Sequence, residues 1–278
     1  MKLGRKAFFE RRDIIMIRKI ALAGVCLLGL SNVALAADVA PLPPSYDWTG
    51  FYIGAGGGYQ WANFDVDTQS CTNGICNQDA GEIYSLGLDD ANWFATAQLG
   101  VDYQFSDSFV IGAMVDVSGG EKLSDSAFNG VDYDPQNNDD GQYWDASLDG
   151  ILTVSARAGF LVTPEALVYG LVGWSWAKAE VNAFEGCDFN GSGSSLCGNS
   201  DVFANNDETV DGLTLGAGLE WMALEHMSVR LEYRYTDFGS IDAYGSYQGP
   251  DSGGNLYEVS TDTDINVQSV RMTLNYRF

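Results

Sequence analysis

The feature of this sequence that most restricts its fold is an alternation of apolar and other residues with a period of two. From Trp93 to Phe105 every second residue is apolar, and the positions between them from Thr96 onward hold Thr, Gln, Gly, Asp and Gln. A β-strand directs successive side chains to opposite faces. This segment therefore predicts a strand with one apolar face and one polar face.

The same pattern recurs along the chain and gives eight candidate strands. Three connections are tight turns, at 106–108, 163–165 and 224–226, and four are long and rich in Asp, Asn, Gly and Ser. An even number of antiparallel strands with short turns at one end and long loops at the other is the layout of outer-membrane barrels. We expect an all-β, eight-stranded antiparallel up-and-down transmembrane β-barrel with short periplasmic turns and long extracellular loops. The strands are predicted at 50–64, 92–105, 109–120, 149–162, 166–179, 210–223, 227–238 and 265–278.

A soluble barrel of the lipocalin type also has eight strands, but the seventh predicted strand argues against it. Four apolar residues share one face of this strand and three charged residues share the other. Placing an arginine against lipid at mid-depth costs about 2–4 kcal/mol, and an unpaired charge in a dry cavity costs more. We therefore expect the apolar face to meet lipid and the charged face to line the lumen. The two sets are Val229, Leu231, Tyr233 and Tyr235, and Arg230, Glu232 and Arg234.

The same phase brings other charged residues into the lumen. Four inward acids match four inward arginines in number, and the planar guanidinium suits bidentate pairing with carboxylates. In the fifth strand the phase is ambiguous, because Trp174 and Trp176 compete with Leu167, Tyr169 and Leu171 for the lipid-facing side. The predicted lumen charge network consists of Asp102, Asp116, Arg157, Glu220, Arg230, Glu232, Arg234 and Arg271.

The first 36 residues have the features of a secretory signal peptide. Arg18 and Lys19 precede an apolar stretch at 20–30, and Ala34–Ala36 resembles a cleavage site. The apolar stretch is shorter than the roughly 20 residues of a membrane-spanning helix. We expect cleavage after Ala36, with Met16 as an alternative translation start. The expected domains are a signal peptide at 1–36, a Pro-rich periplasmic lead-in at 37–47 and the barrel at 48–278.

The exported part is strongly acidic. Residues 1–36 hold 7 of the 14 basic and 2 of the 38 acidic residues, so the remainder carries a net charge of −29. Such a surface repels nucleic acid. The expected partners are outer-membrane lipid and lipopolysaccharide, the outer-membrane assembly machinery, and divalent cations at the loops, where Asp132–Asp134 and Asn137–Asp140 gather oxygen ligands. Their spacing defines no metal site, and no cofactor is predicted.

Four cysteines remain after removal of the leader, and they form two local pairs. In an exported chain this pattern indicates disulfides. A metal site is less consistent, because the single histidine, His226, is far from both pairs in sequence. Adjacency favours the pairing of Cys71 with Cys76 and of Cys187 with Cys197 among three possible connectivities.

Aromatic residues near the predicted strand ends suit the two girdles that such barrels place at the membrane interfaces. Ordinary β-propensity is the alternative explanation for any one of them. The last strand ends on Phe278, and its pairing with the first strand would leave no edge exposed. The predicted girdle residues are Trp48, Phe51, Trp61, Trp93, Tyr103, Phe105, Phe160, Trp221, Tyr235 and Phe238.

Several segments together resemble the small alphaproteobacterial porin-family immunogenic outer-membrane β-barrels, which are related to the transmembrane domain of OmpA. They are DWTGFYIGAGGGY at 47–59, the segment 148–177, EYRYTDFG at 232–239 and the terminal NYRF. The resemblance covers Trp48 to Phe278 and implies an outer-membrane location with a periplasmic N-terminus. It also implies that Phe278 is the signal for the assembly machinery. The acidic, cysteine-bearing loops depart from this family, so no family ligand is transferred.

These observations favour an integral outer-membrane protein with a structural, surface-exposed role, a surface antigen and not an enzyme. About eight strands leave a lumen only wide enough for side chains. The alternative is a small, porin-like, cation-leaning channel, and a third possibility is a haem- or ligand-binding surface protein. Barrel hydrolases usually need a histidine base near the outer rim, whereas His226 is expected in a periplasmic turn.

Overall fold

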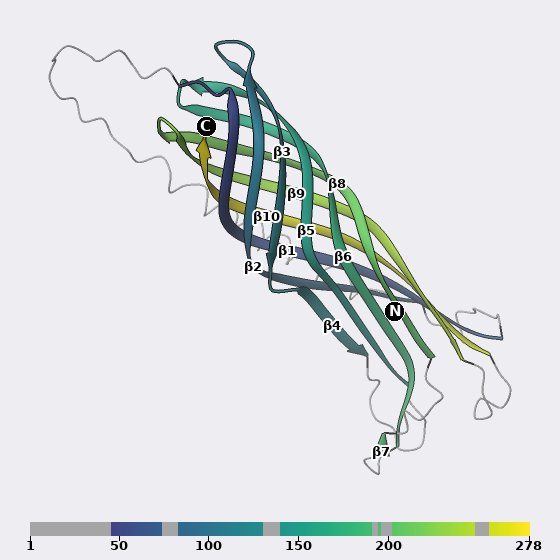
Figure 1. The fold of residues 1–278 in the computed structure, drawn as a ribbon. Coiled ribbons are helices and arrows are strands. Elements are labelled where there is room, and N and C mark those ends of the chain that lie inside the picture. Colours follow the sequence, from purple (N-terminus) through teal and green to yellow (C-terminus); the bar gives the residue numbers. More distant parts are fainter. Residues whose placement is uncertain (1–45, 74–82, 130–139, 191–193, 196–201, 248–255) are drawn as a thin grey trace, which may run out of the picture. The chain divides into compact units, whose positions relative to one another are not determined.

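The computed structural model of the protein describes residues 46–73, 83–129, 140–190, 194–195, 202–247 and 256–278. No helix in these segments is long and apolar enough to cross a membrane. The described chain is built from long antiparallel strands (Figure 1). Their bounds are β1 Gly50–Thr72, β2 Ile83–Gln104, β3 Phe109–Gly120, β4 Leu123–Asn129, β5 Asp140–Thr163, β6 Ala166–Asn190, β7 Ser194–Ser195, β8 Val202–Leu224, β9 Met227–Tyr247 and β10 Tyr257–Arg277.

Eight of these strands form a closed ring in the order β1, β2, β3, β5, β6, β8, β9, β10. The ring closes where β10 pairs with β1 along its whole length, from Tyr52 opposite Arg277 to Thr72 opposite Tyr257. The predicted all-β, eight-stranded antiparallel barrel is confirmed. We call the end with the tight turns, where the chain also ends at Phe278, the turn end, and the opposite end the loop end.

The strands are longer at the loop end than the sequence pattern predicts. β1 continues to Thr72 instead of ending at residue 64, and β9 continues to Tyr247 instead of 238. Part of each predicted loop is therefore strand, including the additional strand β4. The bounds at the turn end agree with the prediction within about two residues, because Ser106, Pro164 and other turn-forming residues end the strands there.

Near the turn end the barrel has an apolar exterior and a polar interior. Trp174 and Trp176 point outward, whereas Leu167, Tyr169 and Leu171 are buried, which settles the phase of the fifth strand. Most predicted girdle residues are exposed on the outer surface, as is clear for Phe51, Trp93, Tyr103, Phe105, Phe160, Trp221 and Tyr235.

Two of the predicted girdle residues lie elsewhere. Trp48 is fully buried at the turn end of the interior, and Phe238 is 4% exposed inside the loop end. The error for Trp48 arose because the segment before β1 folds into the barrel instead of lying along its rim. The error for Phe238 arose because β9 extends well beyond the expected boundary.

Toward the loop end the ring divides into two four-stranded sheets. The β8–β9 ladder ends at Leu213 opposite Asp237, and the β2–β3 ladder ends at Phe94 opposite Gly120, although β2, β8 and β9 all continue. The remaining ladders persist. Sheet I consists of β2, β1, β10 and β9, and sheet II consists of β4, β5, β6 and β8.

The two sheets enclose an apolar core, which we call the apolar tier. Within the described part of the chain it contains 21 buried residues, contributed by both sheets. Trp144 of sheet II donates a hydrogen bond from Nε1 to Thr68 Oγ1 of sheet I, over 2.8 Å. Among the residues that the structure describes, the buried charged side chains all lie in the turn-end part of the interior, so the expectation of a charge-filled lumen does not hold for the described loop-end core. The tier comprises Ala62, Phe64, Val66, Leu88, Leu123, Trp144, Ala146, Leu148, Ile151, Ala177, Ala179, Val181, Ala183, Ala204, Val210, Phe238, Ile241, Ala243, Val259, Ile265 and Val267.

Two glycines mark the transition from barrel to sandwich. Gly150 in β5 has φ +56° and Gly239 in β9 has φ +66°, and the neighbouring ladders shift register at both positions. Each irregularity inverts the alternation. In β9 the buried residues have even numbers up to Phe238 but odd numbers from Ile241. Such bulges bend a strand and redirect its side chains, and here they bring apolar residues into the core between the sheets.

Candidate functional site

The candidate site is the polar interior of the turn-end half. All eight residues of the predicted charge network lie there, each at most 5% exposed. The structure adds Arg277, which is 4% exposed. The network therefore has five arginines and four acids, and the predicted balance of charge was wrong by one. Arg277 has the same parity as Arg271 in the last strand, so the alternation contained the signal that sequence reasoning missed.

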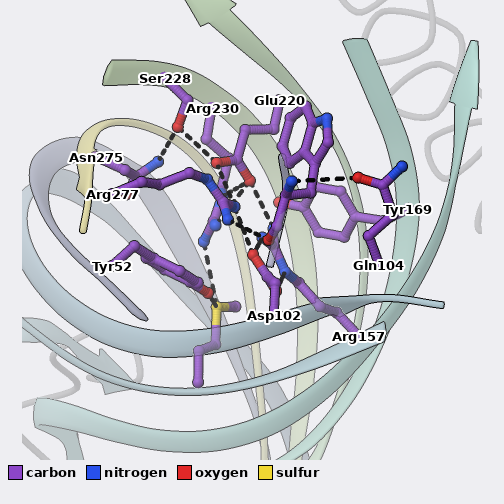
Figure 2. A network of polar contacts seen from close by, with 12 residues as sticks. Tyr52, Asp102, Gln104, Arg157, Tyr169, Glu220, Ser228, Arg230, Asn275 and Arg277 are labelled. Atoms are coloured by element: carbon purple, nitrogen blue, oxygen red, sulfur yellow. Dashed lines mark hydrogen bonds and ion pairs between the residues drawn. The ribbon is translucent and has the colours of Figure 1, made fainter. Parts of the chain in front are cut away.

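The lower network, nearest the turn end, joins Asp102 and Glu220 to three arginines (Figure 2). Arg157 donates to both carboxylate oxygens of Asp102, from Nε to Oδ1 at 2.8 Å and from Nη2 to Oδ2 at 2.5 Å. It also donates from Nη1 to Glu220 Oε2 at 2.7 Å. Arg230 donates to the same Glu220 oxygen from Nη2 at 2.8 Å. Each carboxylate thus lies between guanidinium groups, and strands from opposite sides of the ring are tied together through the interior.

The upper network lies next along the interior and contains two acids and two arginines. Arg234 donates to Asp116 Oδ2 at 2.8 Å and to Glu232 Oε1 at 2.5 Å. Arg271 donates to Asp116 Oδ1 at 2.9 Å. The paired side chains of opposite walls therefore occupy the cross-section of the barrel at this level, and their charges neutralise one another.

Two tyrosines lie against the arginines of the lower network. The guanidinium of Arg157 lies 5.2 Å from the ring centre of Tyr52 and 4.9 Å from that of Tyr169, distances that allow cation–π attraction. The Tyr169 hydroxyl also donates to Glu232 Oε2 at 2.6 Å, which links the lower network to the upper one. Space for the two hydroxyls exists because Gly100 and Gly218 face them, and a Cβ at either glycine would collide with the tyrosine oxygen.

The segment before β1 covers the turn end of the interior. The Trp48 indole donates from Nε1 to the Pro164 carbonyl at 3.1 Å. Its own carbonyl accepts from Arg277 Nη1 at 2.8 Å, and the Arg277 guanidinium lies 4.8 Å from the indole ring centre. The interior is thus occupied at its entrance as well as along its length.

A row of hydroxyl groups separates the charged part from the apolar tier. Thr153, Ser175, Thr214 and Thr236 form a continuous chain of hydrogen bonds from β5 to β9, with separations of 2.8, 2.5 and 2.9 Å. From the turn end toward the loop end, the interior therefore contains the Trp48 indole, the lower and upper charge networks, the row of hydroxyl groups and then the apolar side chains. This arrangement links the strands of the barrel to one another electrostatically. Among the described residues of the interior, no nucleophile is activated by a histidine, because His226 lies in the turn between β8 and β9, with its ring centre 6.0 Å from that of Tyr276.

The other predicted site residues lie outside the interior. Phe278 is 70% exposed at the turn end. Cys71 is disulfide-bonded near the end of β1, while the side chains of Cys76, Cys187 and Cys197 lie outside the described part. The connectivity therefore stays a prediction. Most of the proposed loop ligands, from Asp132 to Asp139, also lie outside the described residues.

Comparison with known proteins places these observations in a family. The model for "Outer membrane protein beta-barrel domain" matches residues 23–278. The 31 kDa outer-membrane immunogenic protein of Brucella melitensis is 27% identical over 94% of this chain and 100% of its own length. The 22 kDa outer membrane protein of Rhizobium leguminosarum is 26% identical over 74% of this chain and 72% of its own. Among solved structures, OprG of Pseudomonas aeruginosa covers 84% of this chain and 99% of its own, with 16% identity and a TM-score of 0.42.

Proposed function

Because this chain belongs to the outer membrane protein beta-barrel domain family of alphaproteobacterial outer-membrane proteins, we propose that it is a closed structural barrel and not a solute channel. In this proposal the turn end faces the periplasm, and the loop end presents an acidic surface to the outside. The relatives are named as outer-membrane or immunogenic proteins, and neither name describes an enzyme. Such a role requires a stable barrel and an accessible loop end.

The observation that supports a closed barrel is the filling of the interior at each described level. The lower network cross-links the walls through Arg157 and Glu220 at 2.7 Å. Beyond the hydroxyl row, Phe64, Trp144 and Ile265 are each no more than 3% exposed within the apolar tier. An ion that crossed the barrel would have to separate paired charges and then enter an apolar region, where its desolvation is unfavourable. Two chemically different barriers therefore lie in series.

Planar-bilayer recording of the purified protein tests this proposal. We expect no discrete openings from the wild-type protein. We also expect none from Arg230→Ala, because the apolar tier remains filled when the lower network is weakened. Leu231→Ala, at the neighbouring lipid-facing position, controls for general disturbance of the strand. Discrete wild-type openings above the empty-bilayer baseline would overturn the proposal in favour of a narrow cation-leaning channel.

The proposed orientation has a separate test, because lysines are so rare. Residues 37–278 contain two lysines, Lys122 and Lys178. Both side chains are exposed on the outside of the loop end. A membrane-impermeant amine reagent applied to intact cells should modify both, and Lys122→Arg with Lys178→Arg should abolish labelling within 37–278. Modification only after disruption of the outer membrane would place the loop end in the periplasm.

A further inference from the structure

The outer surface of the barrel contains an apolar groove near the turn end, across β5, β6 and β8. These three strands are neighbours in the ring (Figure 1). The groove has a volume of about 550 Å³ and begins beside Phe105 and Phe109, next to the turn between β2 and β3. It adjoins a second hollow of about 500 Å³, since Ala158 and Gly170 line both. We call the two hollows together the β5/β6/β8 groove.

A row of small residues on three adjacent strands forms the bottom of this groove. Ala158 lies opposite Gly170, and Gly170 lies opposite Ala217. Apart from its chain neighbours, a Cβ at Gly170 would meet only the Gly216 carbonyl oxygen within 4 Å, at 3.8 Å. Larger outward-facing side chains, each 44–51% exposed, flank the row on both sides. They are Phe160, Val168 and Leu219 toward the turn end, and Val172 and Leu215 toward the loop end.

The place of the groove in the outer surface identifies the chemistry of its occupant. The apolar outer face of an outer-membrane barrel is in contact with lipid acyl chains, and the groove is continuous with that face. Its outward-facing lining residues are aliphatic, aromatic or glycine, so they bring no charged or hydrogen-bonding side chain to a ligand. A methylene chain is the ligand that such a lining fits.

Packing, and not the hydrophobic effect, would select the bound chain. Lipid tails are as apolar as the protein wall, so moving a tail into the groove transfers no apolar surface out of water. A tail in the groove touches the small residues below it and the larger side chains on both sides, whereas a tail on a convex surface touches protein on one side only. The additional van der Waals contacts are individually weak but add up along the chain.

A second copy of the protein fits this groove less well than a lipid. A two-fold dimer brings the same patch of both subunits together. Two hollows would then face each other, and the atoms that line the space between them would lose their contacts. A flexible acyl chain can adapt its shape to the hollow.

We propose that the β5/β6/β8 groove binds one acyl chain of a phospholipid of the periplasmic leaflet and retains that lipid longer than the lipids around the rest of the barrel. The choice of leaflet rests on the proposed function, in which the turn end faces the periplasm. Binding of the chain itself does not depend on a closed interior. A conducting barrel would therefore leave this inference intact.

Photolabelling in vesicles tests whether the groove holds an acyl chain. The full-length processed protein is reconstituted in phosphatidylcholine that contains a small fraction of the same lipid with a diazirine in one acyl chain. After illumination, mass spectrometry locates the adducts. We expect several-fold more adducts at 156–160, 168–172 and 215–219 than at 51–57 of β1. β1 is the matched reference because it lies four strands from β6 in either direction around the ring.

A variant that fills the groove provides the decisive comparison. Gly170→Leu adds a side chain where a Cβ has room and where φ is not in the positive region, so we expect the barrel to fold. Adducts in the groove should fall to the level found on β1. Ala55→Leu adds a similar side chain at an exposed position of β1 and should leave the groove adducts unchanged. A heat-modifiability gel confirms that both variants remain folded.

The lipid retained from native membranes tests the choice of leaflet. Native mass spectrometry of the protein extracted in mild detergent should show one bound phospholipid in the wild type and in Ala55→Leu, and none in Gly170→Leu. Retained lipopolysaccharide in place of phospholipid would overturn the assigned occupant and, together with reversed lysine labelling, would identify the orientation as the error.

Three other results would overturn binding in the groove itself. They are equal labelling of the groove and β1, unchanged labelling in Gly170→Leu, and a dimer that Gly170→Leu disrupts. The last result would identify a second copy of the protein as the occupant.

Discussion

Arg277 Nη2 lies 2.5 Å from Asp102 Oδ2 and thereby connects β10 to β2 across the interior face of the strand between them. β1 pairs with β10 on one side and with β2 on the other. The ion pair therefore spans the seam at which the first and last strands close the ring. Arg277 also donates to the carbonyl of Trp48, so the closing strand and the segment before β1 share one guanidinium.

We predict that Arg277→Gln lowers the stability of the barrel by about 3–5 kcal/mol, the usual cost of removing one partner from a buried ion pair. Asp102 would keep Arg157, but Glu220 and the Trp48 carbonyl would each lose a donor. Urea unfolding in lipid vesicles, followed by tryptophan fluorescence, measures the change. The exposed neighbour Phe278→Ala controls for effects at the terminus. A loss for Arg277→Gln no larger than for the control would show that the seam is held by backbone pairing alone.

We predict that Gly150→Ala and Gly239→Ala each cost about 1–2 kcal/mol, because both glycines have positive φ values that an L-residue with a Cβ disfavours. A Cβ at either position would meet no atom within 4 Å, so the cost is conformational and not steric. Gly119→Ala is the matched control, since its added Cβ also meets open space but its φ is not in the positive region. Urea unfolding should show little change for the control. Equal effects at all three positions would contradict the bulge mechanism.

We predict that Trp144→Ala loosens the loop end while the turn-end barrel stays folded. The indole is 3% exposed in the apolar tier and donates to Thr68 across the two sheets. Removing such a side chain typically costs about 3–5 kcal/mol. Limited proteolysis should cut 140–150 or 202–212 faster, whereas the heat-modifiability gel should still show a folded barrel. Trp176→Ala removes an outward-facing indole and should leave the cleavage rate unchanged. Unchanged proteolysis in Trp144→Ala would mean that the two sheets are held together mainly by the hydrogen bonds between β2 and β4, such as that from the Asp89 amide to Asp125.

The alternation of apolar and polar residues predicted the turn-end half of the barrel, where every second side chain along a strand is buried. Arg230, Glu232 and Arg234 point inward in the structure as the pattern requires. The loop-end strands were missed because Gly150 and Gly239 invert the phase and because acidic residues such as Asp242 and Asp262 occupy the outer face, where they resemble loop composition. Contacts between strands far apart in sequence, such as Arg157 with Glu220, depend on closure of the ring and cannot be obtained from the pattern of one strand.

We predict that the β9–β10 ladder at the loop end becomes more stable on mild acidification. The pKa of Asp262 is raised above its ordinary value, mainly because the folded chain partly shields its carboxyl group from water. The neighbouring Asp242 raises this pKa further, through a hydrogen bond and through charge repulsion. Asp264 acts in the same direction, whereas a hydrogen bond from Ser240 opposes it, and Asp67 lies opposite Asp262 on β1. An acid whose pKa is higher in the folded state binds its proton more tightly there, so stability increases as the pH falls through that pKa.

Hydrogen exchange of the amides at 257–264, at neutral and at mildly acidic pH, measures this effect after correction for the intrinsic pH dependence of exchange. Asp262→Asn should increase protection at neutral pH and should reduce the gain on acidification, because it removes the charge that like-charged neighbours disfavour. Asp107→Asn, in the exposed turn at the other end of the barrel, is the control and should leave protection at 257–264 unchanged. A wild-type ladder that becomes less protected on acidification would show that these carboxylates stabilise the strands in their ionised form, which would reverse the assigned sign.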